Sequence, residues 1–454
     1  MKLNQKVTPL HTHEGAVAKR LTKEQELRRS VLTCLLFEGT FYENGVDIAK
    51  RIQELIPAVD AKTVALLAIE ARKEIGLRHV PLLIAREMAR LPIHKRYVAR
   101  LLPQIITRAD QLTDFLALYW ETNEQPATLS TVPRKRTHTL SSKVKQGLAH
   151  AFTKFDEYQL AKYNQLDKKV KLKDVLFMSH AKPKDLEQAA LWKRLINNQL
   201  KTPDTWNVAL SRGDDKKATF ERLMTEKKLG ALAFVRNLRN MHEAGVDRNM
   251  IEGYGEIIPV DKVYPYQLIA AAKEVPFAET LLDSMIKRAA STLPKLDGKT
   301  ILLVDNSGSM ANKLSAKSKM SYQDAACGLA MILKEQCGNQ IDIYAFSDKV
   351  TPVPPRTGFA LRDAIMRTDI SGTDLGRAVR LANTSPHDRL IVITDEQSRT
   401  TVPNPVVEKA YMINVAANKN GVGYGKWNHI DGFSANVLKW IHLYEFEFCA
   451  DTMF

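Results

Sequence analysis

The spacing of apolar residues changes near residue 295, and this change limits how the 454-residue chain can fold. Before it, residues 21–293 place their apolar side chains at helical intervals of three and four, for example at Leu27, Val31, Cys34 and Leu35. No run of strand-like alternation precedes Thr300. A long stretch of short helices of this kind is typical of a helical-repeat array, which presents an extended concave surface.

After residue 295 short apolar runs alternate with helical patterns. The predicted strands are residues 300–305, 341–346, 390–395 and 410–416, and the predicted helices are residues 321–336, 375–382 and 437–444. Alternation at this spacing indicates an open, mostly parallel sheet covered on both faces, that is, a doubly wound α/β domain. We therefore expect three parts: a mobile arm over residues 1–20, an all-α domain over residues 21–295 and an α/β domain over residues 296–454.

Charge follows the same division. Residues 1–300 hold 50 Lys and Arg against 35 Asp and Glu, whereas residues 301–454 hold 16 of each, so the first part carries the whole net charge of +15. A basic domain joined to a neutral one favours a polyanionic partner, with nucleic acid the first candidate. A basic surface that serves only solubility is the alternative. Basic residues are densest over residues 133–173, where four aromatic residues are interleaved with them: Phe152, Phe155, Tyr158 and Tyr163.

Several protein classes are disfavoured by composition. No apolar run approaches the roughly 20 residues of a membrane helix, and the first 15 residues lack the apolar stretch of a signal peptide. The four cysteines, Cys34, Cys327, Cys337 and Cys449, form no Cys-x-x-Cys pair and no common zinc spacing. We expect free thiols and a cytoplasmic protein that has no contact with a membrane.

Oxygen-bearing side chains follow two of the predicted strands. The first strand ends at Asp305 and continues N-S-G-S-M, which places Ser307 and Ser309 at alternate positions of a tight turn. Thr373 lies in the loop S-G-T-D before a helix, and Asp395 ends another strand. Because ligand sites of open α/β sheets lie at the carboxyl ends of strands, these five side chains are candidate metal ligands. Hard oxygen donors with few charges suit Mg²⁺, and Mn²⁺ would also fit.

The same residues do not resemble a catalytic site. Ser307 stands where a phosphotransferase loop would need a second carboxylate, it is not in a G-x-S-x-G motif, and no motif ties a histidine to it. Two carboxylates and three hydroxyls around one cation would leave a coordination position for a ligand. We therefore expect ligation and no enzyme activity. An Asx turn that closes a strand would give the same D-x-S-x-S letters without a metal.

The segments D-N-S-G-S-M, S-G-T-D and I-T-D-E together resemble the metal-ion-dependent adhesion site of von Willebrand factor A domains. The resemblance extends from about Gly298 to the C-terminus and includes all five candidate ligands. It implies a Rossmann-like fold in which the open metal position accepts an acidic side chain from a partner.

A second resemblance involves the basic helical part. L-A-K-Y at 160–163 and K-D-V-L-F-M-S-H-A-K-P at 173–183 resemble the segment of Ro60 proteins that runs from a Lys-Tyr pair to a Ser-His-x-Lys-Pro motif. A-R-K-E-I-G-L-R-H-V-P at 71–81 resembles the helical repeats of the same family. The order of parts also matches, because TROVE-module Ro proteins carry HEAT-like helical repeats that close into a ring, followed by a von Willebrand A domain.

This resemblance implies binding of small noncoding Y RNA on the outer surface of the ring. It also implies that single-stranded ends of misfolded RNA enter the hole, for RNA quality control or as a scaffold with a nuclease. Lys162 and His180 match RNA-contacting residues of the family, and Lys143 and Lys145 lie where the family has further basic residues. Lys168 or Lys169 stands where the family has an arginine. Between Tyr163 and His180 this sequence has one residue more than the family pattern. A monomer is expected, with an exoribonuclease as a candidate partner, in a bacterial or phage form.

Two other functions remain open at this point. The chain could be a metal-dependent protein-interaction adaptor whose basic helices bind an acidic protein. A weaker alternative is a Mg²⁺-dependent nuclease.

Overall fold

The structure, a computed structural model, describes residues 9–32, 45–120, 139–261, 263–314, 318–416, 418, 420–432 and 436–446. The chain divides into two compact units: one consists of Met1–Ala49 with Thr205–Phe454, and the other is Lys50–Asp204. Within the described ranges, no helix is long and apolar enough to cross a membrane. Five sequence features lie outside the described residues: residues 1–8 of the predicted arm, Cys34, Leu35, Cys449 and the basic residues 134–136.

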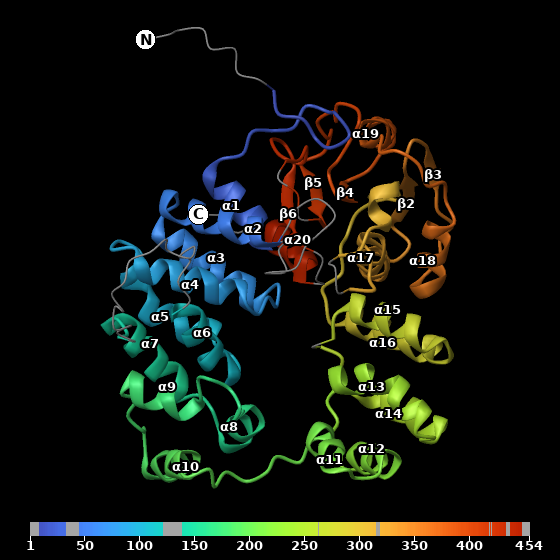
Figure 1. The fold of residues 1–454 in the computed structure, drawn as a ribbon. Helices are drawn as coiled ribbons and strands as arrows, with labels where there is room; N and C mark the ends of the chain where they lie inside the picture. Colours follow the sequence, from blue (N-terminus) through green and yellow to red (C-terminus); the bar gives the residue numbers. More distant parts are fainter. Residues whose placement is uncertain are drawn as a thin grey trace, which may run out of the picture. The chain divides into compact units, whose positions relative to one another are not determined.

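The described residues of the Lys50–Asp204 unit form mainly short helices (Figure 1). The helices are α3 (Ala61–Lys73), α4 (Val80–Arg90), α5 (Lys95–Ile105), α6 (Asp110–Trp120), α7 (Ser142–Phe152), α8 (Glu157–Tyr163), α9 (Leu172–Ser179) and α10 (Leu186–Ile196). Helix α2 (Gly45–Leu55) and the 3-10 turn Ile56–Ala58 precede them. Neighbouring helices pack through the apolar stripes that the sequence predicts, with Val64, Leu102 and Leu148 fully buried.

Residues with known capping or helix-stopping preferences lie at the ends of three of these helices. The Asp185 carboxylate accepts a hydrogen bond of 2.7 Å from the backbone N–H of Gln188, so it caps α10. Pro81 lies in the first turn of α4, where its missing N–H costs no hydrogen bond. Gly76 follows α3 with a φ of +81°, a left-handed conformation that favours glycine and stops the helix.

The other unit contains helices from both ends of the chain. Helix α1 (Lys23–Leu32) comes from the N-terminal part. After residue 205 the helices form consecutive pairs (Figure 1): α11 (Trp206–Arg212) with α12 (Lys216–Thr225), α13 (Ala231–Glu243) with α14 (Arg248–Ile257), and α15 (Pro265–Glu274) with α16 (Glu279–Ser291). A 3-10 turn, Pro276–Ala278, joins the last pair.

A six-stranded sheet follows these helices. Its strands are β1 (Thr300–Asp305), β2 (Ile341–Phe346), β3 (Val350–Pro352), β4 (Arg389–Thr394), β5 (Lys409–Asn414) and β6 (Asn428–Asp431), in the order β3-β2-β1-β4-β5-β6. All neighbours pair in parallel except β3, which is an antiparallel edge strand. The chain leaves β1 towards β2 on one side and later returns as β4 on the other, so the switch point of the topology lies between β1 and β4.

Helices cover both faces of this sheet. Alternate residues of β1, Ile301 and Leu303, share a buried cluster with Leu375 and Val379 of α19 (Leu375–Asn383). The opposite face packs against α17 (Tyr322–Cys337) and α20 (Asn436–Phe446), and α18 (Gly358–Met366) lies against α17. β1 and β4 are buried along their whole length, as expected for central parallel strands.

The fold class predicted from the sequence is confirmed: helices are followed by a doubly wound α/β domain. Among the described residues before Thr300 there is no strand, only one isolated bridge between His11 and Val17. β3, β6 and α18 were not predicted. β6 is N-H-I-D, which has too few apolar residues to read as a strand, and β3 is a three-residue edge strand.

Candidate metal centre and nucleic-acid interface

The two predicted aspartates lie at the carboxyl ends of the two strands that flank the switch point. Asp305 is the last residue of β1, and Asp395 directly follows β4, which pairs with β1. Both residues have no exposed surface. A crevice at this point of an open α/β sheet is where such folds bind their ligands.

The two serines connect the aspartates through hydrogen bonds. The backbone N–H of Ser307 donates to Asp305 Oδ1 at 2.9 Å, which closes the tight turn after β1. The hydroxyl oxygens of Ser307 and Ser309 lie 3.2 Å apart, and the Ser309 hydroxyl donates to Asp395 Oδ2 at 2.6 Å. The structure therefore brings four of the five predicted ligands into one polar cluster.

Two backbone hydrogen bonds connect the loop that carries Thr373 to the loops that carry the other predicted ligands. The N–H of Gly308, between the two serines, donates to the carbonyl of Ser371 at 2.9 Å. The N–H of Arg399, four residues after Asp395, donates to the carbonyl of Thr373 at 2.8 Å. Thr373 itself is only 1% exposed. Three loops that are far apart in the sequence thus meet at the ends of β1 and β4.

Burial and like charge make this cluster suited to a cation. Burial and the neighbouring charge of Asp395 raise the pKa of Asp305 to about 7. The Thr394 hydroxyl donates to Asp305 Oδ2 at 2.6 Å, and no basic side chain of the described chain pairs with Asp305. Among the described residues, no group of three or more His, Cys, Asp or Glu side chains is arranged to hold a metal ion. The predicted donor set here is different, because it consists of two carboxylates with hydroxyls. That set fits Mg²⁺ or Mn²⁺, because hard oxygen ligands with few charges suit both ions.

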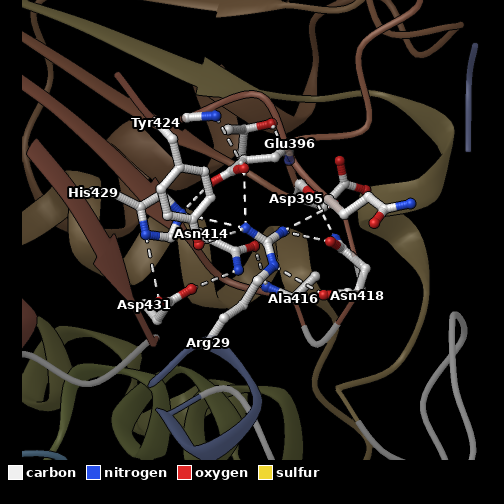
Figure 2. A network of polar contacts seen from close by, with 12 residues as sticks. Arg29, Asp395, Glu396, Asn414, Ala416, Asn418, Tyr424, His429 and Asp431 are labelled. Atoms are coloured by element: carbon white, nitrogen blue, oxygen red, sulfur yellow. Dashed lines mark hydrogen bonds and ion pairs between the residues drawn. The ribbon is translucent and has the colours of Figure 1, made fainter. Parts of the chain in front are cut away.

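A buried ion network, which the sequence did not reveal, lies directly behind Asp395 (Figure 2). Arg29 of α1 is 2% exposed, and its Nη1 lies 3.1 Å from Glu396 Oε2. The same guanidinium donates to the carbonyl of Asn418 at 2.9 Å and to the Asn418 side chain. Asn418 Nδ2 in turn donates to the backbone carbonyl of Asp395 at 2.6 Å. An N-terminal arginine thus helps to hold the loop that carries a predicted metal ligand.

His429 of β6 completes the network. Its ring contacts Glu396 through Nε2, and its Nδ1 lies 3.4 Å from Asp431 Oδ2. Burial alone would lower the pKa of His429, but Asp431 and Glu396 raise it to about 9. Burial alone would raise the pKa of Glu396, but Arg29 and His429 hold it at about 2. We conclude that the buried group carries compensating charges at neutral pH.

Close packing around this network demands glycine. Glu396 adopts a φ of +61°, which is uncommon for a residue with a side chain. A Cβ at Gly421 would overlap Glu396 Oε2 and lie 2.6 Å from Arg29 Nη1.

The N-terminal segment contacts the same part of the structure. Thr12 Oγ1 donates to the Ser398 carbonyl at 2.7 Å, and the Lys19 N–H donates to the Gly421 carbonyl at 3.0 Å. Part of the predicted arm therefore contacts the loop that follows Asp395 and the segment at Gly421.

The predicted RNA contacts lie in the Lys50–Asp204 unit. Lys145 of α7 and His180, which follows α9, approach each other with Nζ and Nε2 3.4 Å apart. His180 is exposed and adopts the left-handed conformation, with a φ of +54°, that ends α9. Lys143, Lys162 and Lys169 are exposed as well. The structure therefore joins one lysine of α7 to the histidine of the Ser-His motif.

Two of the other predicted RNA-contacting lysines, Lys162 and Lys168, have neighbouring side chains of different kinds. Lys162 Nζ lies 5.5 Å from the ring centre of Tyr158 and 5.7 Å from that of Tyr163. Lys168 pairs with Asp114 at 3.0 Å, so its charge is already partly compensated. Of the aromatic residues interleaved with the basic ones, Tyr158 is 48% exposed, whereas Phe152 and Phe155 are in the core. Their helical spacing with other apolar residues explains this burial.

The comparison with known families agrees with this arrangement. The family profile of the TROVE domain matches residues 3–198 and 183–292, which is more than half of the chain. The chain belongs to the TROVE-domain family. As a TROVE protein it is an RNA-binding protein of the Ro type, as the sequence motifs predicted. The six predicted RNA contacts all lie within the first matched range, and a von Willebrand factor type A domain matches residues 300–397 of the TROVE protein, a range that contains all five predicted metal ligands.

A solved structure supports the fold of this TROVE protein. The crystal structure of the Deinococcus radiodurans RO (RSR) protein is similar, with a TM-score of 0.55 and 17% sequence identity. The similarity covers 92% of this chain and 99% of that chain. No curated protein sequence matches the TROVE protein significantly.

Proposed function

We propose that this TROVE protein binds Y-like small noncoding RNA on the surface formed by α7, α8 and α9. We further propose that it takes up single-stranded ends of misfolded RNA and acts in RNA quality control without catalysing a reaction. The contact between Lys145 and His180 carries the proposal. Lys145 lies on α7 and His180 follows α9, and the two side chains meet in the basic part of the chain.

The chemistry of this surface supports RNA as the ligand. Exposed lysines bind phosphate oxygens and release counterions, which gives affinity that does not depend on sequence. A partly exposed ring such as Tyr158, with the Lys162 ammonium beside it, provides a stacking surface for an unpaired base. RNA hairpins with unpaired nucleotides offer both features, phosphates and accessible bases.

The metal centre is proposed to be a docking site within an α/β domain over residues 296–454. Asp305, Ser307, Ser309, Thr373 and Asp395 would hold Mg²⁺ or Mn²⁺, which would supply an open coordination position for an acidic side chain of a protein partner. An exoribonuclease is one such candidate partner. The buried carboxylates of Asp305 and Asp395 support a cation here, because their mutual repulsion would otherwise oppose folding.

Binding of a purified RNA hairpin by fluorescence anisotropy tests the proposal. We expect measurable affinity at low salt that weakens steeply as salt is added. The double variant Lys145→Ala/His180→Ala should bind at least about tenfold more weakly, since it removes a charge and a ring from the surface. A matched control is Lys299→Ala, which removes an exposed lysine from the predicted α/β domain. Absence of RNA affinity at low salt would contradict the proposal.

The protein-adaptor alternative predicts a different result. An adaptor would retain its protein partners after RNase treatment, whereas partners held through RNA would be lost. Incubation of RNA with the protein and Mg²⁺ should leave the RNA intact, and cleavage that Asp305→Ala abolishes would contradict a non-catalytic role.

A further inference from the structure

A pocket opens between the end of α9 and α10, beside His180. It has a volume of about 390 Å³ and belongs wholly to the Lys50–Asp204 unit. Its described lining residues are Leu176, Phe177, His180, Ala181, Pro183, Ala189, Trp192, Lys193 and Ile196. None of these lining residues is acidic.

Two aromatic side chains line this pocket. Phe177 is 57% exposed, which is unusual for a large apolar ring on a helix whose other face is packed. Trp192 is 4% exposed, and its ring is fixed by an edge-to-face contact with Phe152 at 5.4 Å between ring centres. The apolar lining thus combines an accessible ring with a rigid one.

The Trp192 indole also has an unused donor. Its Nε1 is buried and has no hydrogen-bond acceptor among the described residues. A buried N–H without an acceptor costs free energy, so such groups in native proteins usually have a water or ligand partner. A ligand in the pocket that carries a carbonyl oxygen or a ring nitrogen would provide an acceptor.

Two lysines lie at or next to the pocket. Lys193 lines the pocket, and Lys145 contacts the His180 ring at 3.4 Å. The left-handed conformation of His180 ends α9, so the chain reverses direction there and the exposed imidazole remains at the edge of the pocket. An apolar peptide side chain would fit the lining but would leave these cations without a counter-charge. A nucleotide has both a planar ring and a phosphate.

We propose that this pocket receives a single unpaired nucleobase of the bound RNA, an inference that rests on the proposed RNA-binding function. The base contacts the Phe177 ring, Trp192 Nε1 donates to one of its acceptors, and the adjacent phosphates lie near Lys145 and Lys193. Base–aromatic contacts of this kind tolerate different bases, because every base has a π-face. The pocket would therefore select RNA by the presence of an unpaired nucleotide rather than by its sequence.

Two RNA hairpins test this proposal with the full-length protein. They share one stem, and one of them carries a single extra unpaired uridine in that stem. We expect the wild-type protein to bind the hairpin with the unpaired uridine about tenfold more tightly, the effect of roughly one stacked base. Phe177→Ala should reduce this preference to less than about twofold.

A matched variant and a crosslink complete the test. Leu186→Ala removes a comparable apolar side chain that is 90% exposed and does not line the pocket, so it should keep the preference. Trp192→Phe retains a ring but removes the donor, and it should weaken only the hairpin with the unpaired base. With 5-iodouridine at the unpaired position, irradiation should crosslink the RNA to the peptide that contains Phe177 or Trp192.

The outcomes separate the pocket from the general proposal. If wild type binds both hairpins equally, the pocket proposal is overturned and RNA binding stands. If wild type binds neither hairpin, the proposed function fails and the pocket proposal with it. A preference that persists in Phe177→Ala, or a crosslink elsewhere in the chain, would also overturn the pocket proposal.

Discussion

The guanidinium of Arg29 lies 3.1 Å from the carboxylate of Glu396, and the two residues are 367 positions apart in the sequence. Both side chains are almost completely buried, with exposed fractions of 2% and 0%. Glu396 directly follows the predicted metal ligand Asp395. The N-terminal helix is thereby connected to the loop that carries Asp395 by a charge pair that solvent screens very little.

Removal of Arg29 should destabilise the protein strongly. Arg29→Met leaves Glu396 buried without this partner, and loss of one member of a buried pair costs about 3 to 5 kcal/mol of unfolding free energy. Urea unfolding of purified protein measures the change. The neighbouring Arg28 is half-buried over the Trp440 ring, so Arg28→Met should cost only about 1 kcal/mol. Equal effects of the two substitutions would contradict a special role for Arg29.

Stability should depend on the charge of His429 in alkaline solution. The pKa of His429 is raised from 6.5 to about 9, so its protonated form stabilises the folded state fully below pH 6.5. That contribution, up to about 3 kcal/mol, is lost as pH rises from 6.5 through 9. In unfolding measurements at several pH values, His429→Gln should be less stable at pH 6 but should lack this decline. His150→Gln, at an exposed position, should retain the wild-type decline.

Mg²⁺ should raise the melting temperature through Asp305. A ligand that binds only the folded state at 100 times its Kd adds about 2.7 kcal/mol, or several degrees. Because the pKa of Asp305 is about 7 and the ligand must be ionised, Mg²⁺ affinity should fall as pH decreases below 7. Asp305→Asn should abolish the thermal shift, and Asp342→Asn, at an exposed carboxylate of β2, should preserve it. An unchanged shift in Asp305→Asn would place the cation elsewhere.

The salt dependence of RNA binding should identify phosphate contacts. A lysine that neutralises one phosphate contributes about 0.9 to the slope of log K against log salt concentration for a duplex. Lys162→Ala should therefore reduce the magnitude of the slope by roughly 1. Lys168 already pairs with Asp114 at 3.0 Å, so Lys168→Ala should change the slope less. A slope that is the same in wild type and Lys162→Ala would remove Lys162 from the interface.

Local sequence pattern was sufficient for much of the α/β domain. Asp305, Ser307 and Ser309 are adjacent in the chain, so one strand-to-turn motif places them together. Asp395 could be added because the carboxyl ends of neighbouring parallel strands meet at one edge. Arg29 could not be found in this way. The helix that carries Arg29 has an ordinary apolar stripe. Arg29 is buried only because α1 packs against loops that are distant in the sequence.

The nucleic-acid interface was harder to predict from the sequence, because it also depends on contacts between residues that are far apart in the chain. A dense run of lysines does not reveal which of them are paired, and the ion pair between Lys168 and Asp114 joins residues 54 positions apart. The pocket beside His180 depends on how α9 and α10 approach each other. Trp192 carries no sequence signal for ligand binding, since a tryptophan at helical spacing usually belongs to the core.

Mapping of ultraviolet crosslinks between the native protein and its bound cellular RNA, by mass spectrometry, tests the RNA-binding role most directly. If RNA lies on the surface of α7, α8 and α9, the crosslinked peptides should come from residues 142–196 and should include the region of Lys145 and His180. The crosslinks should disappear from this region in Lys145→Ala/His180→Ala. Crosslinks confined to the α/β domain, or no bound RNA at all, would contradict it.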